Sequence, residues 1–287
     1  YKQIVPFYAV PTVPLQPGLF LLSFCKKQPF PFSVQKVLLF LSMPFLSNIS
    51  CTIPNVSSYP FNIPSFKDGI QLRVPSNVTF FVGENGSGKS TLLEGVAEKI
   101  GFNLRGGNRN HNLNTGLGFQ GYESPLTRSI NLSWTPRVIN EGFFMRAESF
   151  FNFANYIDEL AETDSRIYNA YGGKSLHHQS HGESFLALFT NQFEAGIYIL
   201  DEPEAALSPA RILSFMSIIH QLEQSGRAQF IIAIHSPILL CYPNATIYNF
   251  DEDGIKKVHY SETEHYMLTK GFLDRPDFFL KHLFQQE

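Results

Sequence analysis

A glycine-rich stretch has the residue types and the spacing of a phosphate-binding loop. It fits the pattern G-x-x-x-x-G-K-[ST], in which three glycines allow a tight turn and a close backbone approach to an anion. The amides of such a loop, and of a helix that follows it, point positive dipoles at phosphate. We therefore expect Lys89 to reach the β- and γ-phosphates of ATP, and the Ser90 hydroxyl to bind Mg²⁺. The residues expected to bind ATP are Gly83, Glu84, Asn85, Gly86, Ser87, Gly88, Lys89, Ser90 and Thr91.

The sequence on both sides of the loop supports this interpretation. Residues 78–82 are a β-branched and aromatic run, which predicts a buried strand. Residues 91–100 carry apolar side chains at helical spacing, which predicts a helix that Gly101 ends. A glycine turn that merely starts a helix is the alternative, and the order of strand, loop and helix disfavours it.

Two acidic residues follow a second apolar run. Residues 197–200 predict a buried parallel strand, and Asp201 and Glu202 stand at its carboxyl end, where ligands bind in α/β sheets. Asp201 is expected to hold Mg²⁺ through water, and Glu202 to polarise an attacking water. The alternative is a pair of solvated acids at a strand end, which the preceding apolar residues disfavour.

Two further features stand in a workable order along the chain. His235 follows the apolar run at residues 229–234, where its imidazole could contact the γ-phosphate or align the water. A histidine with a purely structural role is the alternative. Residues 180–183 combine a hydroxyl, a glycine and a helix N-terminus, which suits contact with a γ-phosphate but is a weak signal by itself.

Other segments predict the elements that position these residues. Residues 129–138 alternate like a strand of a small antiparallel sheet, and residues 142–147 predict a buried strand that ends at Glu148. Asp253 and Gly254 form a hairpin signal between two further strands. Helices are predicted at residues 150–162, 209–224 and 267–284, the last interrupted near Pro276.

Composition divides the chain in two. Residues 1–67 hold five lysines and no acid, whereas the remainder holds 17 basic and all 25 acidic residues. We expect residues 1–57 to be a poorly specified, apolar, proline-rich leader, either disordered or non-native, and residues 58–287 to form the folded domain. The longest apolar run of the leader is shorter than the roughly 20 residues of a membrane helix, so we expect no stable membrane insertion. Deleting residues 1–57 should leave ATP binding intact.

Net charge and cysteine content narrow the setting. The net charge of −3 gives no global basic field for nucleic acid or membrane, although a local basic groove stays open as an alternative. Cys25, Cys51 and Cys241 show neither metal-ligand spacing nor a disulfide framework. A reduced, cytoplasmic setting is therefore the simpler interpretation.

These motifs resemble those of the ABC-type ATPases. Residues 83–91, 180–183, 197–202, 206–209 and His235 look like the Walker A, signature, Walker B, D-loop and H-loop of that family, respectively. The closer likeness is to the non-transporter branch, which includes SMC-like and RecF-like DNA-repair ATPases.

Within that branch, three stretches look like a family of small, stand-alone predicted bacterial AAA-type ATPases. They are residues 142–151, 179–184 and 201–209, and the resemblance as a whole covers about residues 59–283. It implies an α/β P-loop NTPase with a mainly parallel central sheet, a small antiparallel β subdomain and a helical signature subdomain, formed by residues 58–287. It also implies ATP and Mg²⁺ as cofactors and an ATP-dependent homodimer that sandwiches two ATP molecules. The signature residues that would complete the partner's site are Ser180, His181, Gly182 and Glu183.

The chain departs from the family pattern at two of these places. His181 replaces the second Ser or Gly that transporters usually carry in the signature. Glu148 stands where the pattern often has the Q-loop glutamine, and as a catalytic residue it could still bind Mg²⁺ or water; Gln120 is the other candidate for that role. The segment between Lys89 and Ser180 is too short for an inserted coiled-coil arm, which excludes a rod-like SMC architecture.

A Mg²⁺-dependent ATPase that switches between open and ATP-closed states is the leading hypothesis. Three alternatives describe its output: action on nucleic acid in repair or defence, the nucleotide-binding subunit of an ABC transporter, and an ATP-gated interaction module with little turnover. Glu202 and His235 argue against the third because they predict a competent hydrolytic site. DNA-stimulated hydrolysis would favour the first, and a separate membrane partner would favour the second.

Overall fold

The structure is a computed structural model that describes residues 43–54, 58–104, 124–137, 141–148, 150–171, 173–178 and 181–284. The chain divides into two units, Tyr1–Phe40 and Leu41–Glu287, and all described residues lie in the second. The predicted leader ends at residue 57, so the last part of it falls within this second unit.

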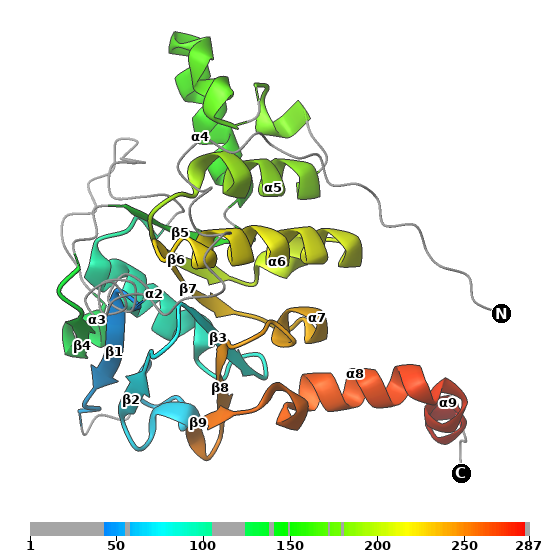
Figure 1. Cartoon of the computed structure of the whole chain (residues 1–287). Helices are drawn as coiled ribbons and strands as arrows, with labels where there is room; N and C mark the ends of the chain where they lie inside the picture. The colour runs from blue at the N-terminus through cyan, green and yellow to red at the C-terminus, as the bar shows by residue number, and fades with distance from the viewer. Residues whose placement is uncertain are drawn as a thin grey trace, which may run out of the picture. The chain divides into compact units, whose positions relative to one another are not determined.

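Six of the described strands form a mixed sheet in the order β5-β6-β7-β3-β8-β9 (Figure 1). The strands β5, β6, β7, β3 and β8 are parallel, and only the pair β8 and β9 is antiparallel. The central sheet is therefore mainly parallel, as predicted. The strand bounds are β3 Val78–Gly83, β5 Gly142–Arg146, β6 Gly196–Asp201, β7 Ala228–Ala233, β8 Thr246–Asp251 and β9 Gly254–Val258.

A separate three-stranded antiparallel sheet has the order β2-β1-β4. Its strands are β1 Leu46–Cys51, β2 Ile70–Arg73 and β4 Ile130–Trp134, and the last confirms the strand predicted in a small antiparallel sheet. The side chain of Gln229 on β7 ties β1 to the main sheet, because it accepts from Leu46 N and donates to Leu46 O, both at 2.8 Å.

The position of β1 corrects the prediction for the leader. The sequence predicts no fold for residues 46–51, yet they form the central strand of the small sheet, and Leu46 and Ile49 are fully buried. Ile49 packs in the same core as the helix that follows the glycine loop. Deleting residues 1–57 would remove this strand and leave β2 and β4 without their shared partner, so it is not the neutral truncation that composition suggests.

Helices cover both faces of the main sheet, and the two-residue period of the strands divides the core accordingly. Phe80 and Tyr198 pack with α4 (Phe150–Thr163), α5 (His181–Gln192), α6 (Pro209–Gln224) and α7 (Pro237–Leu240). Their neighbours Phe81 and Ile199 pack with α2 (Lys89–Ile100) and the small sheet. The sheet is therefore buried on both faces, which explains why its strands are continuous apolar runs.

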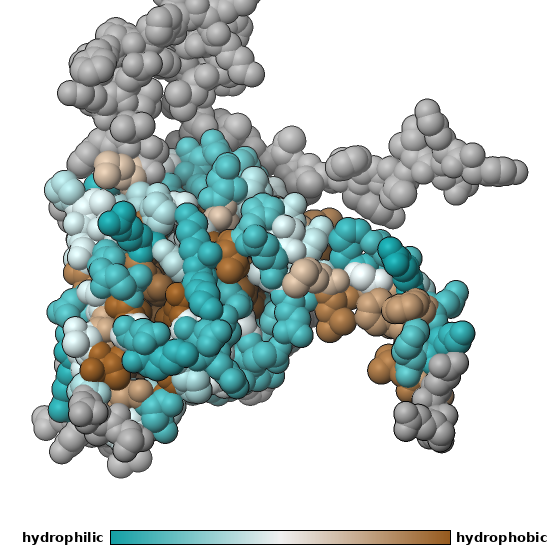
Figure 2. Space-filling view, turned by 90° about the horizontal axis from the view of Figure 1, so that it is seen from below, coloured by the Kyte–Doolittle hydropathy of each residue, from teal (hydrophilic) through white to brown (hydrophobic). Residues whose placement is uncertain are grey.

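The remaining helical elements are short or peripheral. They are η1 Pro64–Phe66, α3 Pro125–Ser129, η2 Ser165–Tyr171, η3 Leu176–His178, η4 Pro203–Ala206, η5 Tyr260–Glu262, α8 Glu264–Asp274 and α9 Pro276–Phe284. The helices α8 and α9 confirm the predicted helical region with a break before Pro276, and neither contains a buried residue. Both helices carry exposed apolar side chains, among them Leu273 and Phe284. Figure 2 shows brown, hydrophobic surface in the part of the molecule that these helices form. Among the described residues, no helix has the length and apolar character needed to cross a membrane.

Candidate nucleotide-binding and hydrolytic site

The glycine loop connects β3 to α2 in the conformation that its sequence predicts. Gly88 is the N-cap of α2 with φ 101°, and a Cβ there would lie 2.9 Å from the Phe66 ring. Gly86 has φ 80°, and a Cβ there would meet no atom within 4 Å. Packing therefore requires glycine at position 88, whereas the loop at Gly86 faces open space of the kind that a phosphate could enter.

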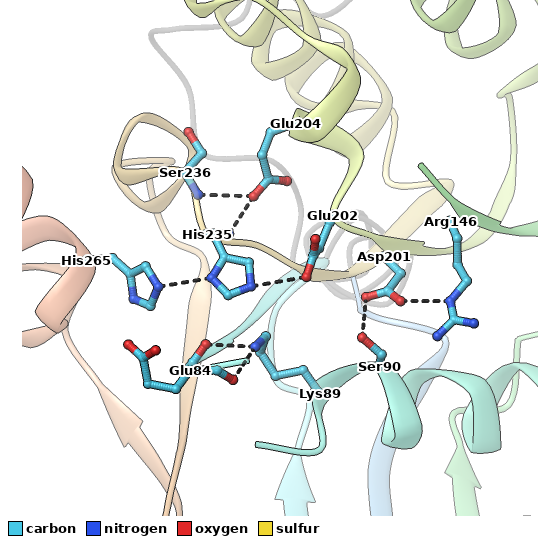
Figure 3. A network of polar contacts seen from close by, with 11 residues as sticks. Glu84, Lys89, Ser90, Arg146, Asp201, Glu202, Glu204, His235, Ser236 and His265 are labelled. Atoms are coloured by element: carbon cyan, nitrogen blue, oxygen red, sulfur yellow. Dashed lines mark hydrogen bonds and ion pairs between the residues drawn. The ribbon is translucent and has the colours of Figure 1, made fainter. Parts of the chain in front are cut away.

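Lys89 lies under this loop as a buried cation. Its Nζ donates to Gly83 O at 2.7 Å and to Glu84 O at 2.9 Å, and the residue is 3% exposed (Figure 3). Burial lowers the pKa of Lys89, while the carboxylates of Glu202 and Asp201 act in the opposite direction. The ammonium is thus held at the loop that is expected to bind phosphate.

Asp201 ends β6 and is joined to both neighbouring elements. It accepts from Ser90 Oγ on α2 at 3.0 Å and from Arg146 Nε on β5 at 3.0 Å. Arg146 lies directly opposite Asp201 in the parallel pairing of β5 with β6, and it also forms an ion pair with Glu94 on α2. Burial lowers the pKa of Arg146, but the hydrogen bond to Asp201 and the charge of Glu94 outweigh it and raise that pKa overall.

Ser90 and Asp201 are suitable ligands for Mg²⁺. A hydroxyl and a carboxylate oxygen converge here, and both are hard oxygen donors. The described residues contain no group of three or more His, Cys, Asp or Glu side chains that could hold a metal. That is compatible with Mg²⁺ at a phosphate site, where the ion keeps waters and binds phosphate oxygens in addition to one or two protein groups.

Glu202 turns away from the strand that Asp201 ends. Its backbone has φ 52° and ψ 48°, in the left-handed region, and its N–H still donates to Ala233 O at 3.0 Å. Its Oε1 lies 3.1 Å from His235 Nε2, just beyond the end of β7. Burial and the nearby charge of Lys89 lower the pKa of His235, so the neutral ring is favoured.

Glu204 fixes the backbone that carries His235. One carboxylate oxygen of Glu204 accepts from the backbone N–H of His235 and from that of Ser236, the latter at 3.1 Å. Its other oxygen, Oε2, is buried without a hydrogen-bond partner. Burial raises the pKa of Glu204, even though the backbone donors act to lower it.

The structure brings together most of the residues predicted for the site. The ends of β3, β6 and β7 place Lys89, Ser90, Asp201, Glu202 and His235 around one region (Figure 3). Residues of the glycine loop line two pockets. The pocket lined by Lys89 and Ser90 is also lined by Glu202.

The predicted signature and Q-loop residues are placed less completely. Ser180 and Gln120 lie outside the described residues. His181, Gly182 and Glu183 begin α5, where Glu183 pairs with Arg211 Nη2 on α6 at 3.2 Å. A Cβ at Gly182 would lie 2.4 Å from Nη1, at the flexible end of the Arg211 side chain. Glu148 follows β5 and is exposed.

Arg146, Glu94, Glu204 and His265 belong to this network but are not predicted from the sequence. Arg146 and Glu94 are ordinary charged residues until the order of the strands places β5 beside β6. The only available signal was a cation at the end of an otherwise apolar run, at Arg146. His265 lies on α8, and its Nε2 is 3.0 Å from His235 Nδ1. No local sequence pattern predicts this contact.

No protein-family model matches the chain. The Ribose import ATP-binding protein RbsA of Burkholderia mallei is 28% identical over 187 residues, covering 58% of this chain and 35% of that protein. The Galactose/methyl galactoside import ATP-binding protein MglA of Vibrio cholerae is 25% identical over 173 residues, covering 55% of this chain and 34% of that protein. The chain thus spans about a third of the length of these curated relatives.

Two of the solved structures that are similar to the chain share little sequence identity with it. The SMC head domain from Thermotoga maritima has a TM-score of 0.42 at 15% identity and covers 75% of this chain and 98% of its own. The protein cbiO1 from Clostridium perfringens, part of the ABC transporter complex cbiONQ, has a TM-score of 0.44 at 17% identity and covers 84% and 100%. Both TM-scores are below 0.5. The sequence relatives support an ABC-type, P-loop ATP-binding protein and leave the non-transporter branch unconfirmed.

Proposed function

We propose that this chain binds ATP with Mg²⁺ at residues 83–91 and hydrolyses it as an ABC-type ATPase. One observation carries the proposal: two consecutive acids beside the buried Lys89 make two different contacts. Asp201 lies 3.0 Å from the Ser90 hydroxyl, and Glu202 lies 3.1 Å from the His235 ring. A structural salt-bridge network would not require a glycine loop with open space at its centre. The similarity to proteins named as ATP-binding supports the same proposal.

The roles of the residues follow from their surroundings. The loop amides and Lys89 bind the phosphates, while Ser90 and Asp201 hold Mg²⁺, which when bound neutralises charge on the phosphate oxygens. Glu202 is partly exposed, with a side-chain exposure of 42%, so it can take a proton from a water that attacks the γ-phosphate. His235 contacts Glu202 and so restrains the orientation of its carboxylate. The charge of Glu148 acts to raise the pKa of Arg146. In this proposal Glu148 contributes to the environment of Mg²⁺ or of the attacking water.

The test is ATP turnover by the full chain with and without Mg²⁺, together with ATP affinity. In the Lys89→Ala variant, ATP affinity should fall by at least about 100-fold, since a buried cation with charge-assisted hydrogen bonds to phosphate is lost. Lys99→Ala is the matched control, because Lys99 is exposed on the same helix. Unchanged ATP affinity in Lys89→Ala would overturn the assignment of the glycine loop.

The proposed cycle includes ATP-gated dimerisation. The signature residues 180–183 lie at the start of α5 in the sequence, and in the proposed dimer they complete the ATP site of a second copy. The support is the motif order together with the exposed side chain of Glu183 at the beginning of that helix. A Glu202→Gln variant with ATP and Mg²⁺ should elute as a dimer on size exclusion, whereas a strictly monomeric result would contradict the dimer.

Two outputs of the cycle are proposed for test, each with its own support. Action on nucleic acid in repair or defence rests on the motifs that resemble the non-transporter branch. Service as a nucleotide-binding subunit of an importer rests on relatives that are named for ribose and galactose import. Both place the chain in the cytoplasm. Stimulation of ATP turnover by DNA or RNA favours the first output, and stimulation only by a membrane partner favours the second. Turnover too slow to matter under either condition would favour an ATP-gated interaction module.

A further inference from the structure

His265 on α8 contacts His235 on the side opposite to Glu202. The distance from His265 Nε2 to His235 Nδ1 is 3.0 Å, and that from His235 Nε2 to Glu202 Oε1 is 3.1 Å. Figure 3 shows the three side chains as a continuous line from α8 to the end of β6. The ring centroids of the two histidines are 5.0 Å apart. His235 thus has a hydrogen-bonding partner at each ring nitrogen.

The chemistry of these partners fixes the position of each proton. An ionised Glu202 can only accept, so it pairs with a neutral His235 only in the tautomer that carries its proton on Nε2 and presents a lone pair at Nδ1. His265 must then donate from Nε2, because the opposite arrangement would bring two lone pairs together. Burial and Lys89 lower the pKa of His235, which favours the neutral ring that this pattern requires.

The local structure holds His265 in place without extensive packing. The helix α8 begins after Thr263, whose hydroxyl accepts from Tyr266 N, and the preceding turn η5 has a capping box formed by His259 and Glu262. His265 is half-buried, whereas most of α8 beyond it is exposed. The position of His265 is therefore set by the start of its helix.

His265 also faces the region expected to hold the nucleotide. It lines one pocket with Gly83, Glu84 and Asn85 of the glycine loop. The charged groups that act on His235, contact its backbone or line the pocket with His265 are Lys89, Glu84, Glu202, Glu204, Asp251, Glu252, Glu262 and Glu264. Among them, Glu202 is the one whose carboxylate accepts from the His235 ring. The two hydrogen bonds therefore donate in one direction, from His265 on α8 through His235 to Glu202.

We propose that His265 is a positioning residue for His235. By donating from Nε2, it holds His235 in the tautomer protonated on Nε2 and keeps that N–H directed at Glu202. The proposal rests on the proposed hydrolytic function of Glu202 and His235, because it gives His265 a role in that same site. It extends the site to an element, α8, that carries none of the predicted motifs.

The first test reads the tautomer directly and does not depend on ATP hydrolysis. The nucleotide-free full chain, with ¹⁵N-labelled histidine, is studied by NMR at about pH 8, where ordinary histidines are neutral. Wild type should show His235 protonated on Nε2 alone. In His265→Leu, His235 should shift to a mixture that includes the form protonated on Nδ1. A His235 protonated on Nδ1 in wild type, or an identical tautomer in His265→Leu, would overturn the proposal.

The second test uses a conservative rescue. Glutamine places an amide N–H near the position of the histidine Nε2, so His265→Gln should restore both the tautomer and the turnover. His265→Leu should lower kcat by about 10-fold, a fraction of the ~10²–10⁴ that proton-transfer catalysis contributes, with ATP affinity unchanged. His282→Leu, on the exposed surface of α9, is the control. Equal loss of turnover in the Gln and Leu variants would contradict a donor role for His265. If wild type shows no turnover, the proposed function fails while the tautomer measurement still decides the role of His265.

Discussion

The two acids at the end of β6 are adjacent in sequence and differ in almost every physical respect. Asp201 continues the strand, is buried, and accepts from a hydroxyl and a guanidinium. Glu202 has left the strand with a positive φ, is much more exposed, and pairs with a histidine ring that is favoured in its neutral form. Two consecutive residues thus place one carboxylate against a guanidinium and the next against a neutral imidazole.

This difference matches the division of work that we propose for the two acids. Arg146 and the Ser90 hydroxyl hold Asp201 in one orientation, which suits a group that must hold a cation at a fixed place. Glu202 keeps access to the pocket beside Lys89 and Ser90, which suits a group that must take a proton from water. The left-handed backbone at Glu202 produces the division, because a continued strand would have placed its side chain on the opposite face of a buried sheet.

Removing the charge of Glu202 should have the largest effect on hydrolysis. In Glu202→Gln, we expect turnover to fall by about 100- to 10,000-fold, because an amide cannot accept the proton, while ATP affinity stays within a few-fold of wild type. Single-turnover hydrolysis and equilibrium ATP binding measure the two quantities. Glu159→Gln, on the exposed surface of α4, is the control. Near-normal turnover in Glu202→Gln would assign the proton acceptor to another residue.

The corresponding change at Asp201 should act on the metal instead. In Asp201→Asn, the Mg²⁺ concentration for half-maximal turnover should rise by about 10- to 100-fold, because a carboxylate that orients the ion through water is lost. Glu202→Gln should leave that concentration unchanged, so the two variants together separate the roles. Titration of Mg²⁺ at saturating ATP measures the effect. Equal Mg²⁺ dependence in both variants would remove the distinction between the two acids.

Arg146 should be needed for stability more than for chemistry. Arg146→Met leaves Asp201 and Glu94 without their shared cation, and we expect a loss of about 1.5–3 kcal/mol in the free energy of unfolding, the range for hydrogen bonds to charged groups. Arg146→Lys should lose less, since it keeps the charge without the planar fork. Urea unfolding measures both. Arg166→Met, which breaks a pair on the surface, should give no measurable change.

Local patterns were sufficient for the central part of the fold. They were also sufficient to predict that Lys89, Ser90, Asp201, Glu202 and His235 lie in one region. The loop at 83–91, the apolar runs before Asp201 and His235, and helix 209–224 are each encoded within a short window, so their elements are confirmed. The mainly parallel sheet could be predicted for the same reason, because continuous apolar strands that alternate with helices are typical of parallel sheets. The observed strand order confirms it.

The sequence prediction was wrong or incomplete where distant segments meet. Residues 46–51 form a strand because they pair with β2 and β4 and hydrogen-bond to Gln229. Nothing in the acid-free sequence around them indicates these partners. Arg146 becomes a partner of Asp201 only when β5 is placed next to β6. His265 reaches His235 from a position just before the helical region predicted at 267–284.

We expect the smallest effect from a change at Glu204. This residue holds the backbone of His235, the partner of Glu202, and takes no part in the proposed chemistry. Burial raises its pKa in the folded chain, so it stabilises the fold fully below its unfolded pKa. That contribution is lost as the pH rises through the raised folded pKa. Gln in its place can still accept from the N–H groups of His235 and Ser236 but does not titrate.

Relative to wild type, Glu204→Gln should therefore become more favourable as the pH rises from the ordinary glutamate range toward neutrality. We expect the difference between the two free energies of unfolding to move in favour of the variant throughout this range. Urea unfolding of both proteins across this pH range gives that difference. The pKa of Glu94, also raised by burial, should affect wild type and variant alike and cancel. Parallel stability curves would show that the Glu204 carboxylate is tolerated as well in the fold as in water, and that its two backbone donors fully offset its burial.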